Sequence, residues 1–190
     1  MLQEAAFELF LENSYAGTSI DQITTRAGVS RNTFFNYFDA KSDVFWVDLD
    51  ETIGELAQML KGTPEQVPAL QAIQDAILRL AREFGPSRVP FALTQYLLIG
   101  SARELQASAL VRFTKQAKVL HDFLLRRLPH VDPLFARAAA YAALGATVAA
   151  AQEWAAAGTT RGPLEPYLAS VLGPVIRGFE AALGNEAGTP

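Results

Sequence analysis

The chain has 190 residues, of which 50% are hydrophobic and 19% charged, a composition typical of a folded globular protein and not of a disordered or fibrous one. It contains no cysteine and only two histidines, so the sequence predicts no disulfide, no metal site and no cofactor. The net charge of −4 argues against a general attraction to nucleic acid, and residues 1–50 contain three basic side chains against eight acidic ones.

No apolar run is long enough to cross a bilayer. The longest one, residues 138–151, is rich in alanine and ends at Gln152 and Glu153. The first ten residues lack the basic and apolar regions of a signal peptide. We therefore expect no membrane span and a cytoplasmic location.

The N-terminal residues predict three short helices in succession. Apolar residues recur with helical spacing over residues 2–10, and this helix is expected to end near Asn13. Ser19, with a glutamine three residues later, fits a capping box that opens a second helix. Gly28 supplies a positive-φ residue that ends the second helix, and Ser30 caps a third. Two helices joined by a tight glycine turn predict a helix-turn-helix motif.

A longer helix is predicted next, over residues 41–60, where it would connect this head to the rest of the chain. The loop at residues 61–64 and the later Pro68 mark the clearest break in the sequence. Helical patterns then follow over residues 70–84, 90–99, 104–128, 133–157 and 164–183. With no strand alternation and no repeat, the sequence predicts an all-α protein of about nine helices. We assign residues 1–46 to a head domain and residues 47–190 to a body domain.

The third helix has one face for the core and one for solvent. Phe34 and Phe38 lie four residues apart and can pack on apolar residues of the first two helices. The polar residues left facing outward are Arg31, Asn32, Thr33, Asn36 and Tyr37. A helix-turn-helix places such a face in the major groove of DNA. There an arginine could contact guanine and the asparagines adenine, while Thr33 and Tyr37 could contact phosphate or a thymine methyl group.

Four further residues could contact the DNA. Thr18 and Ser19 place hydroxyl and backbone N–H groups at the start of the second helix, where a phosphate can bind. Lys41 is a cation near the start of a helix, an unfavourable position that an adjacent phosphate would relieve. Ser30 lies at the start of the third helix. Each group also has an ordinary explanation, because Thr18, Ser19 and Ser30 are expected as helix caps and polar residues on short helices usually face solvent.

Residues 2–46 closely resemble the DNA-binding head of TetR/AcrR-family regulators. The matching positions are Leu9-Phe10, Tyr15, Thr18-Ser19, Ala27 to Ser30, Thr33, Phe34-Phe35, Tyr37-Phe38 and Lys41. The resemblance implies a three-helix DNA-binding head followed by a helical bundle for ligand binding and dimerisation. It also implies a transcriptional repressor that binds a palindromic operator in double-stranded DNA as a homodimer and is released by a small apolar or amphipathic effector.

The chain departs from the family pattern at three places. Family members usually carry a basic stretch before the first helix, whereas this chain starts inside that helix, so either residues precede it or DNA binding is unusually salt-sensitive and weak. Phe35 stands where tyrosine is frequent, which removes a hydroxyl that could touch phosphate. Ser14 stands where a helix-ending glycine is common, and we expect Asn13 to adopt the left-handed conformation instead.

The resemblance implies that the last two helices, residues 133–157 and 164–183, pair across a two-fold axis. The first of them is rich in alanine and includes Gly145, which permits close helix approach, although a tight core helix within one chain fits the sequence equally well. An apolar effector pocket is expected in the body. Its candidate lining residues are Phe91, Tyr96, Arg112, Phe113, Gln116, Tyr141 and Trp154.

A row of basic residues in the helix predicted over residues 104–128 gives one indication of the effector's chemistry. Arg112, Lys115 and Lys118 recur every three residues, as either a solvated face or a clamp for an anionic ligand such as the phosphates of an acyl-CoA. Residues 32–50 are similar to a subset of TetR-like regulators with acyl-CoA-like ligand domains, including those linked to mycofactocin clusters. The resemblance therefore implies an acyl-CoA-like effector.

Two other classes of function compete with a DNA-binding regulator. A helical-bundle enzyme would need a nucleophile with its base, a metal cluster or a phosphate-binding glycine loop, and the sequence contains no such motif, so no catalytic residue is predicted. The alternative is a helical protein–protein adaptor that kept the fold but lost DNA binding, which the acidic head favours. Failure of the dimeric protein to bind any genomic DNA at low salt would exclude the regulator.

Overall fold

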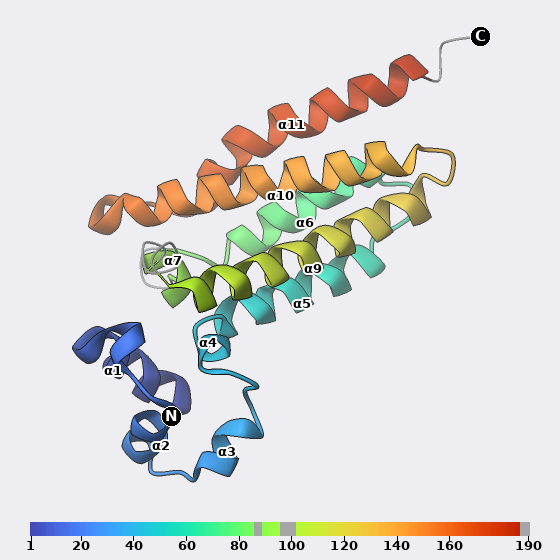
Figure 1. The fold of residues 1–190 in the computed structure, drawn as a ribbon. Coiled ribbons are helices and arrows are strands. Elements are labelled where there is room, and N and C mark those ends of the chain that lie inside the picture. Colours follow the sequence, from blue (N-terminus) through green and yellow to red (C-terminus); the bar gives the residue numbers. More distant parts are fainter. Residues whose placement is uncertain (86–88, 96–101, 187–190) are drawn as a thin grey trace. The chain divides into compact units, whose positions relative to one another are not determined.

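The computed structural model describes residues 1–85, 89–95 and 102–186. Within them the chain forms ten α-helices and no strand (Figure 1), so the predicted all-α fold is confirmed. The helices of the N-terminal part are α1 (Leu2–Gly17), α2 (Ile20–Ala27), α3 (Arg31–Phe35), α4 (Lys41–Val44) and α5 (Val47–Lys61). The later helices are α6 (Ala69–Ala81), α7 (Phe91–Thr94), α9 (Arg103–Arg127), α10 (Pro133–Ala156) and α11 (Glu165–Glu186).

The predicted helix-turn-helix is present, and its local interactions are the expected ones. The Ser19 hydroxyl accepts from the backbone N–H of Gln22, whose side-chain oxygen accepts from the Ser19 N–H, which completes a capping box for α2. Gly28 ends α2 with a φ of 67°. The Ser30 hydroxyl accepts from the Thr33 N–H and caps α3.

The end of α1 differs from the prediction, because Ser14 and not Asn13 takes the positive φ. Ser14 has a φ of 66° and a ψ of 163°, a conformation that glycine adopts with little strain. Its hydroxyl accepts from the Gly17 N–H at 3.2 Å, and its carbonyl accepts from the Thr18 hydroxyl at 2.8 Å. These two hydrogen bonds hold the serine in a strained conformation, and α1 therefore resumes for one turn after the break.

The helix predicted over residues 41–60 is interrupted and forms α4 and α5. The N–H groups of Phe45 and Trp46 donate to the carbonyls of Ser42 and Asp43, three residues earlier, which tightens the turn between the two helices. Both aromatic side chains are buried. The break in the helix thus places two consecutive large side chains in the same core.

The chain divides into two compact units, and the first contains the head. It consists of Met1–Glu51 together with Pro90–Val111. Its core is built from the inward faces of α1 to α4 together with residues of α7 and α9, namely Ala6, Leu9, Phe10, Tyr15, Ile23, Phe34, Val44, Phe45, Trp46, Ala92 and Leu105. As predicted, Phe34 is fully buried and Phe38 packs on this core.

The second unit consists of Thr52–Val89 and Arg112–Pro190. In it α11 packs on α10 and on α6 (Figure 1). By length and composition alone α10 could cross a membrane, but nine of its residues are buried in the structure, as in a core helix. Helices α5 and α9 each have residues in both units. The predicted domain boundary after residue 46 remains a proposal.

Candidate functional site

The outward face of α3 presents a row of polar side chains. Arg31, Asn32, Asn36 and Tyr37 are exposed, and Thr33 is half-buried, while Phe34 on the opposite side is inaccessible to solvent. The helical turn continues past α3, because the N–H of Asn36 donates to the Asn32 carbonyl and those of Tyr37 and Phe38 donate to the Phe34 carbonyl. The structure therefore brings all five predicted DNA contacts of this helix onto one short, continuous segment.

The two predicted serine contacts act as helix caps in this structure. Ser19 and Ser30 are both exposed, and the hydroxyl of each accepts a backbone N–H three residues ahead. The Ser30 hydroxyl also lies 2.9 Å from the Thr33 hydroxyl. Each hydroxyl is therefore placed at the open N-terminal end of a helix, where an anion is favoured. Contact of either serine with DNA remains a prediction.

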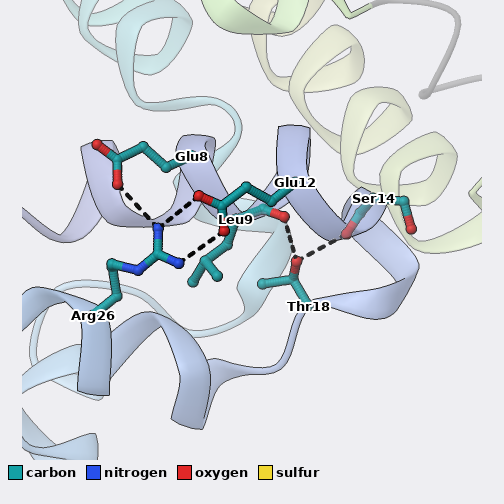
Figure 2. A network of polar contacts seen from close by, with 6 residues as sticks. All are labelled: Glu8, Leu9, Glu12, Ser14, Thr18 and Arg26. Carbon is teal, nitrogen blue, oxygen red and sulfur yellow. Dashed lines mark hydrogen bonds and ion pairs between the residues drawn. The ribbon is translucent and has the colours of Figure 1, made fainter.

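Thr18 and Lys41, also predicted to contact DNA, both donate to backbone carbonyls of α1 or of its C-cap. The Thr18 side chain is buried, and its hydroxyl lies 3.0 Å from the Leu9 carbonyl oxygen and 2.8 Å from that of Ser14 (Figure 2). The Lys41 ammonium group donates to the carbonyls of Tyr15 and Thr18 at 2.8 and 2.9 Å. The Lys41 ammonium group therefore adds a charged donor at the end of the helix, where carbonyls lack some of their intrahelical partners.

The half-buried ammonium group of Lys41 has a perturbed pKa. Burial lowers the pKa of Lys41 below its ordinary value, and the carboxylate of Glu104 on α9 partly opposes that shift. Burial also raises the pKa of the Tyr15 hydroxyl above its ordinary value, and Glu104 adds to it. Glu104 thus influences both the Lys41 ammonium group and the Tyr15 hydroxyl within the first unit, and the raised pKa keeps that hydroxyl neutral.

All three basic side chains of residues 1–50 have intramolecular partners. The Arg31 guanidinium Nη1 lies 2.6 Å from Asp21 Oδ1 on α2. Figure 2 shows the Arg26 guanidinium between two carboxylates of α1, at 3.2 Å from Glu8 and 2.8 Å from Glu12. The Lys41 ammonium group binds the carbonyls described above.

Sequence reasoning missed two partners of the candidate DNA-contacting residues. Asp21 was only counted among the acidic residues of the head, although it pairs with Arg31 across the turn. Phe35 is 44% exposed, and its ring centroid lies 5.6 Å from the Arg31 guanidinium carbon. The only available signal was the placement of one acidic and one basic residue on either side of Gly28, which is too common a pattern to predict a pair.

The residues predicted to line an effector pocket lie in different parts of the structure. Phe113 on α9 and Tyr141 on α10 are in contact, with ring centroids 5.6 Å apart and nearly perpendicular planes. Gln116 is half-buried one turn after Phe113 on α9, and Arg112 is half-buried beside it. These four residues therefore form one neighbourhood of the second unit.

Two other predicted residues have contacts of their own, and a third lies outside the described residues. Phe91 belongs to the first unit, where its ring stacks on Phe7 at a centroid distance of 3.9 Å. Trp154 has no exposed surface, and its indole N–H donates to the Gly162 carbonyl at 2.8 Å. Tyr96 lies outside the described residues. Whether Phe91, Tyr96 and Trp154 touch an effector remains a prediction.

The basic row on α9 is mostly exposed. Lys115 and Lys118 face solvent, and Lys118 pairs with Asp122 one turn later. The Lys118 ammonium group holds the pKa of the Asp122 carboxyl below its ordinary value. The described residues contain no group of three or more acidic or histidine side chains arranged to hold a metal ion.

The outer face of α10 is an apolar stripe. Leu134, Tyr141 and Val148 recur every seven residues and are 67, 45 and 39% exposed, and Ala138 and Gly145 lie between them on the same face and are also exposed. The spacing alternates between three and four residues, as in helices that pack along one another. A Cβ atom added at Gly145 would meet no atom within 4 Å.

Two protein families match this chain. The family of bacterial regulatory proteins of the tetR type matches residues 2–45, and the MftR C-terminal domain matches residues 67–180. A Mycobacterium tuberculosis protein named as the mycofactocin biosynthesis transcriptional regulator MftR is 24% identical over 154 residues, which are 80% of this chain and 77% of the relative.

Solved structures of regulators have the same fold. FadR from Bacillus subtilis, crystallised in complex with stearoyl-CoA, is 20% identical with a TM-score of 0.63, covering 93% of this chain and 97% of that one. FadR from Thermus thermophilus, in complex with lauroyl-CoA, is 22% identical with a TM-score of 0.57, covering 93% and 92% of the two chains.

Proposed function

The chain belongs to the TetR family of bacterial regulatory proteins and is a DNA-binding transcriptional regulator, and we propose that it is a homodimeric repressor that binds a palindromic operator and is released by an acyl-CoA-like effector. Residues 1–46 would bind the DNA, and residues 47–190 would bind the effector and form the dimer. A cytoplasmic location is part of the proposal, because the chromosomal target lies there.

The observation that carries the DNA-binding proposal is the polar face of α3 above the buried Phe34. Arg31, Asn32 and Asn36 are exposed there and carry the groups that contact base edges in the major groove. Tyr37 is 74% exposed and can reach the phosphate backbone. If this face of the second helix only contacted solvent, its side chains would not have to be of the types that bind base edges and phosphates.

Dimerisation is proposed through α10 and α11. One helix-turn-helix head spans only a half-site, so a palindromic operator requires two heads. The apolar stripe of α10 is the largest exposed row of apolar side chains on that helix, and its small residues, Ala138 and Gly145, would let a second copy approach closely. Exposed small residues continue on α11, at Ala169 and Gly178.

The effector proposal rests on Phe113, Gln116 and Arg112 of α9 and on Tyr141 of α10, whose ring contacts Phe113 and which also belongs to the apolar stripe proposed for the dimer. Aromatic rings can contact an acyl chain, and cations such as Arg112 and Lys115 can bind the phosphates of the coenzyme A group. Two solved structures with this fold contain acyl-CoA molecules, which supports the same ligand class here.

The proposed mechanism is a shift between two populations of the dimer. Helices α5 and α9 each have residues in both compact units, so a movement of either helix in the body also moves residues of the unit that contains the head. An effector that binds one arrangement of these helices better than the other would change the fraction of dimers competent to bind DNA.

The DNA-binding part is tested by selection from a library of random double-stranded DNA with the full chain. A homodimeric repressor should enrich a two-fold symmetric sequence with half-sites separated by about one helical turn, roughly 34 Å. Enrichment of no sequence at low salt by a dimeric, folded protein would contradict the proposal and favour the adaptor.

The effector part is tested by titrating the protein–operator complex with long-chain acyl-CoA, free coenzyme A and the free fatty acid. Acyl-CoA should release the DNA at lower concentrations than free coenzyme A or the free fatty acid. Phe113→Ala should weaken release by acyl-CoA at least tenfold, while Lys115→Gln should weaken it less for the fatty acid than for acyl-CoA. Equal release of the operator by all three compounds, or by none, would contradict the proposed ligand class.

A further inference from the structure

Arg31, the candidate guanine contact, is held from two sides in the structure. Its Nη1 lies 2.6 Å from Asp21 Oδ1, and its guanidinium carbon lies 5.6 Å from the ring centroid of Phe35. Asp21 is in the first turn of α2, and Phe35 is the last residue of α3. Side chains of two different helices therefore restrict the orientation of one exposed arginine.

The contact with Asp21 leaves Arg31 able to bind a base. A guanidinium group has five N–H donors in a planar fork, and the carboxylate oxygen accepts from one nitrogen, Nη1. The Nε and Nη2 hydrogens remain on the other edge, and two parallel donors are what the O6 and N7 atoms of guanine accept. Asp21 and a guanine can thus bind the same guanidinium at once.

We infer that Asp21 is a positioning residue for base recognition: it orients Arg31 so that the bidentate contact with guanine is favoured over contacts with other bases or phosphates. An arginine that is not held in place would lose more side-chain conformational entropy when it binds a base, and it could bind the nearest phosphate instead. The carboxylate also repels the phosphate backbone and so weakens indiscriminate binding. The inference rests on the proposed DNA-binding function.

The same head offers a matched control. Asp39 is also an exposed aspartate of the first unit, but it lies in the loop between α3 and α4 and forms no ion pair with Arg31. Asp39→Asn and Asp21→Asn therefore change the net charge of the head equally. Only the second substitution removes the carboxylate that binds Arg31.

The experiment is a selection from random double-stranded DNA with four full-length proteins: wild type, Arg31→Ala, Asp21→Asn and Asp39→Asn. Arg31→Ala should lose the preference for guanine at one position of each half-site. In Asp21→Asn, the preference for guanine over the other bases at that same position should fall at least threefold. This variant should also bind random DNA more tightly. Asp39→Asn should also bind random DNA more tightly but should keep the wild-type discrimination.

Asp21→Ser serves as a second variant that removes the carboxylate, and thermal melting of each variant checks folding. Equal tightening of operator and random DNA by Asp21→Asn, with discrimination unchanged, would show that Asp21 only competes with DNA for Arg31 and would overturn the inference. An unchanged guanine preference in Arg31→Ala would overturn it as well. Failure of the wild type to enrich any sequence would instead contradict the proposed function itself.

Discussion

The ammonium group of Lys41 lies 2.8 Å from the backbone carbonyl oxygen of Tyr15 and 4.1 Å from the centroid of the Tyr15 ring. The same group donates to the Thr18 carbonyl at 2.9 Å. A cation at the C-terminal end of a helix is favoured by the helix dipole and by the unpaired carbonyls found there. In the free protein Lys41 therefore stabilises the end of α1, whether or not it also contacts DNA.

We expect Lys41→Met to lower the free energy of unfolding by about 1–3 kcal/mol, because the shielded Tyr15 and Thr18 carbonyls would lose a charged donor and the Tyr15 carbonyl would keep only the Thr18 N–H at 3.4 Å. Lys61→Met, at an exposed position at the end of α5, is the control and should change stability by less than about 0.5 kcal/mol. Urea denaturation of the three proteins measures both effects. Equal stabilities of Lys41→Met and the wild type would contradict the stabilising role of Lys41.

The stability of the protein should fall in alkaline solution because of Tyr15. Burial, with the nearby Glu104, raises the pKa of the Tyr15 hydroxyl in the folded state, whereas in the unfolded state it ionises with its ordinary pKa of 10.0. The stabilising contribution is fully present below that pH and is lost as the pH rises further, because only the unfolded state then releases the proton.

Tyr15→Phe should therefore lose less stability than the wild type between about pH 9 and pH 11. The pKa of Lys41 is lowered in the folded state, so its contribution to stability rises with pH and opposes that of Tyr15. The quantity to measure is therefore the difference in stability between Tyr15→Phe and the wild type, which both contain Lys41. Tyr37→Phe, at an exposed position, should follow the wild-type curve. If Tyr15→Phe and the wild type lost stability in parallel, the Tyr15 hydroxyl would not be responsible.

At position 14, glycine should give a more stable protein than alanine, which is the reverse of their usual order in a helix. In a helix interior alanine is more stable than glycine by about 1 kcal/mol, but Ser14 has a φ of 66°, where a Cβ atom is strained by roughly 1–2 kcal/mol. Both Ser14→Ala and Ser14→Gly remove the hydroxyl, so the comparison isolates the backbone. We expect Ser14→Gly to have the higher melting temperature, and the opposite order would refute the strained conformation.

Residues 1–50 alone predict a shallow salt dependence of operator binding, in contrast to the salt-sensitive binding expected above, because the dependence grows with each phosphate contact and few cations are present. Residues 1–50 contain three basic side chains, so the two heads of a dimer provide six. If each neutralised one phosphate, the slope of log K against log salt would be no steeper than about −5. Titrations at several salt concentrations give this slope directly. A steeper value would show that cations outside residues 1–50 also contact the DNA.

The local features of the head could be predicted from sequence because each depends on residues three or four positions apart. The Ser19 capping box, the positive φ of Gly28 and the Ser30 cap are of this kind, and all three are confirmed. The break in α1 was misplaced by one residue, since Asn13 is the better left-handed residue on propensity and only the hydrogen bonds of Ser14 decide otherwise.

Contacts between distant residues could not be predicted in the same way. Asp21 and Arg31 are separated by the glycine turn, and their distance depends on how α2 and α3 pack. Phe91 was predicted to line the effector pocket on its aromatic character alone, which stays a prediction, but no pattern indicated that its ring stacks on Phe7, more than eighty residues earlier in the chain. Its partner is determined by the packing of the whole first unit, which no short sequence pattern contains.

The apolar stripe of α10 gives a test of the dimer that leaves the fold of the single chain intact. A Cβ atom at Gly145 would meet no atom within 4 Å in the described chain, so Gly145→Glu should be accommodated in the monomer. Replacing a helical glycine should even stabilise α10, by up to about 1 kcal/mol. In a dimer packed through this face, the larger charged side chain would lie between the two closely approaching helices.

Gly54 provides the control, because it is exposed within α5 and an added Cβ atom there would also meet nothing within 4 Å. We expect Gly145→Glu to be monomeric by light scattering and to bind the operator at least tenfold more weakly, with a helical circular dichroism spectrum like that of the wild type. Gly54→Glu should remain dimeric. A dimeric Gly145→Glu protein would place the dimer interface away from this face of α10, since a buried, unpaired carboxylate is too costly for a closely packed helix pair to retain.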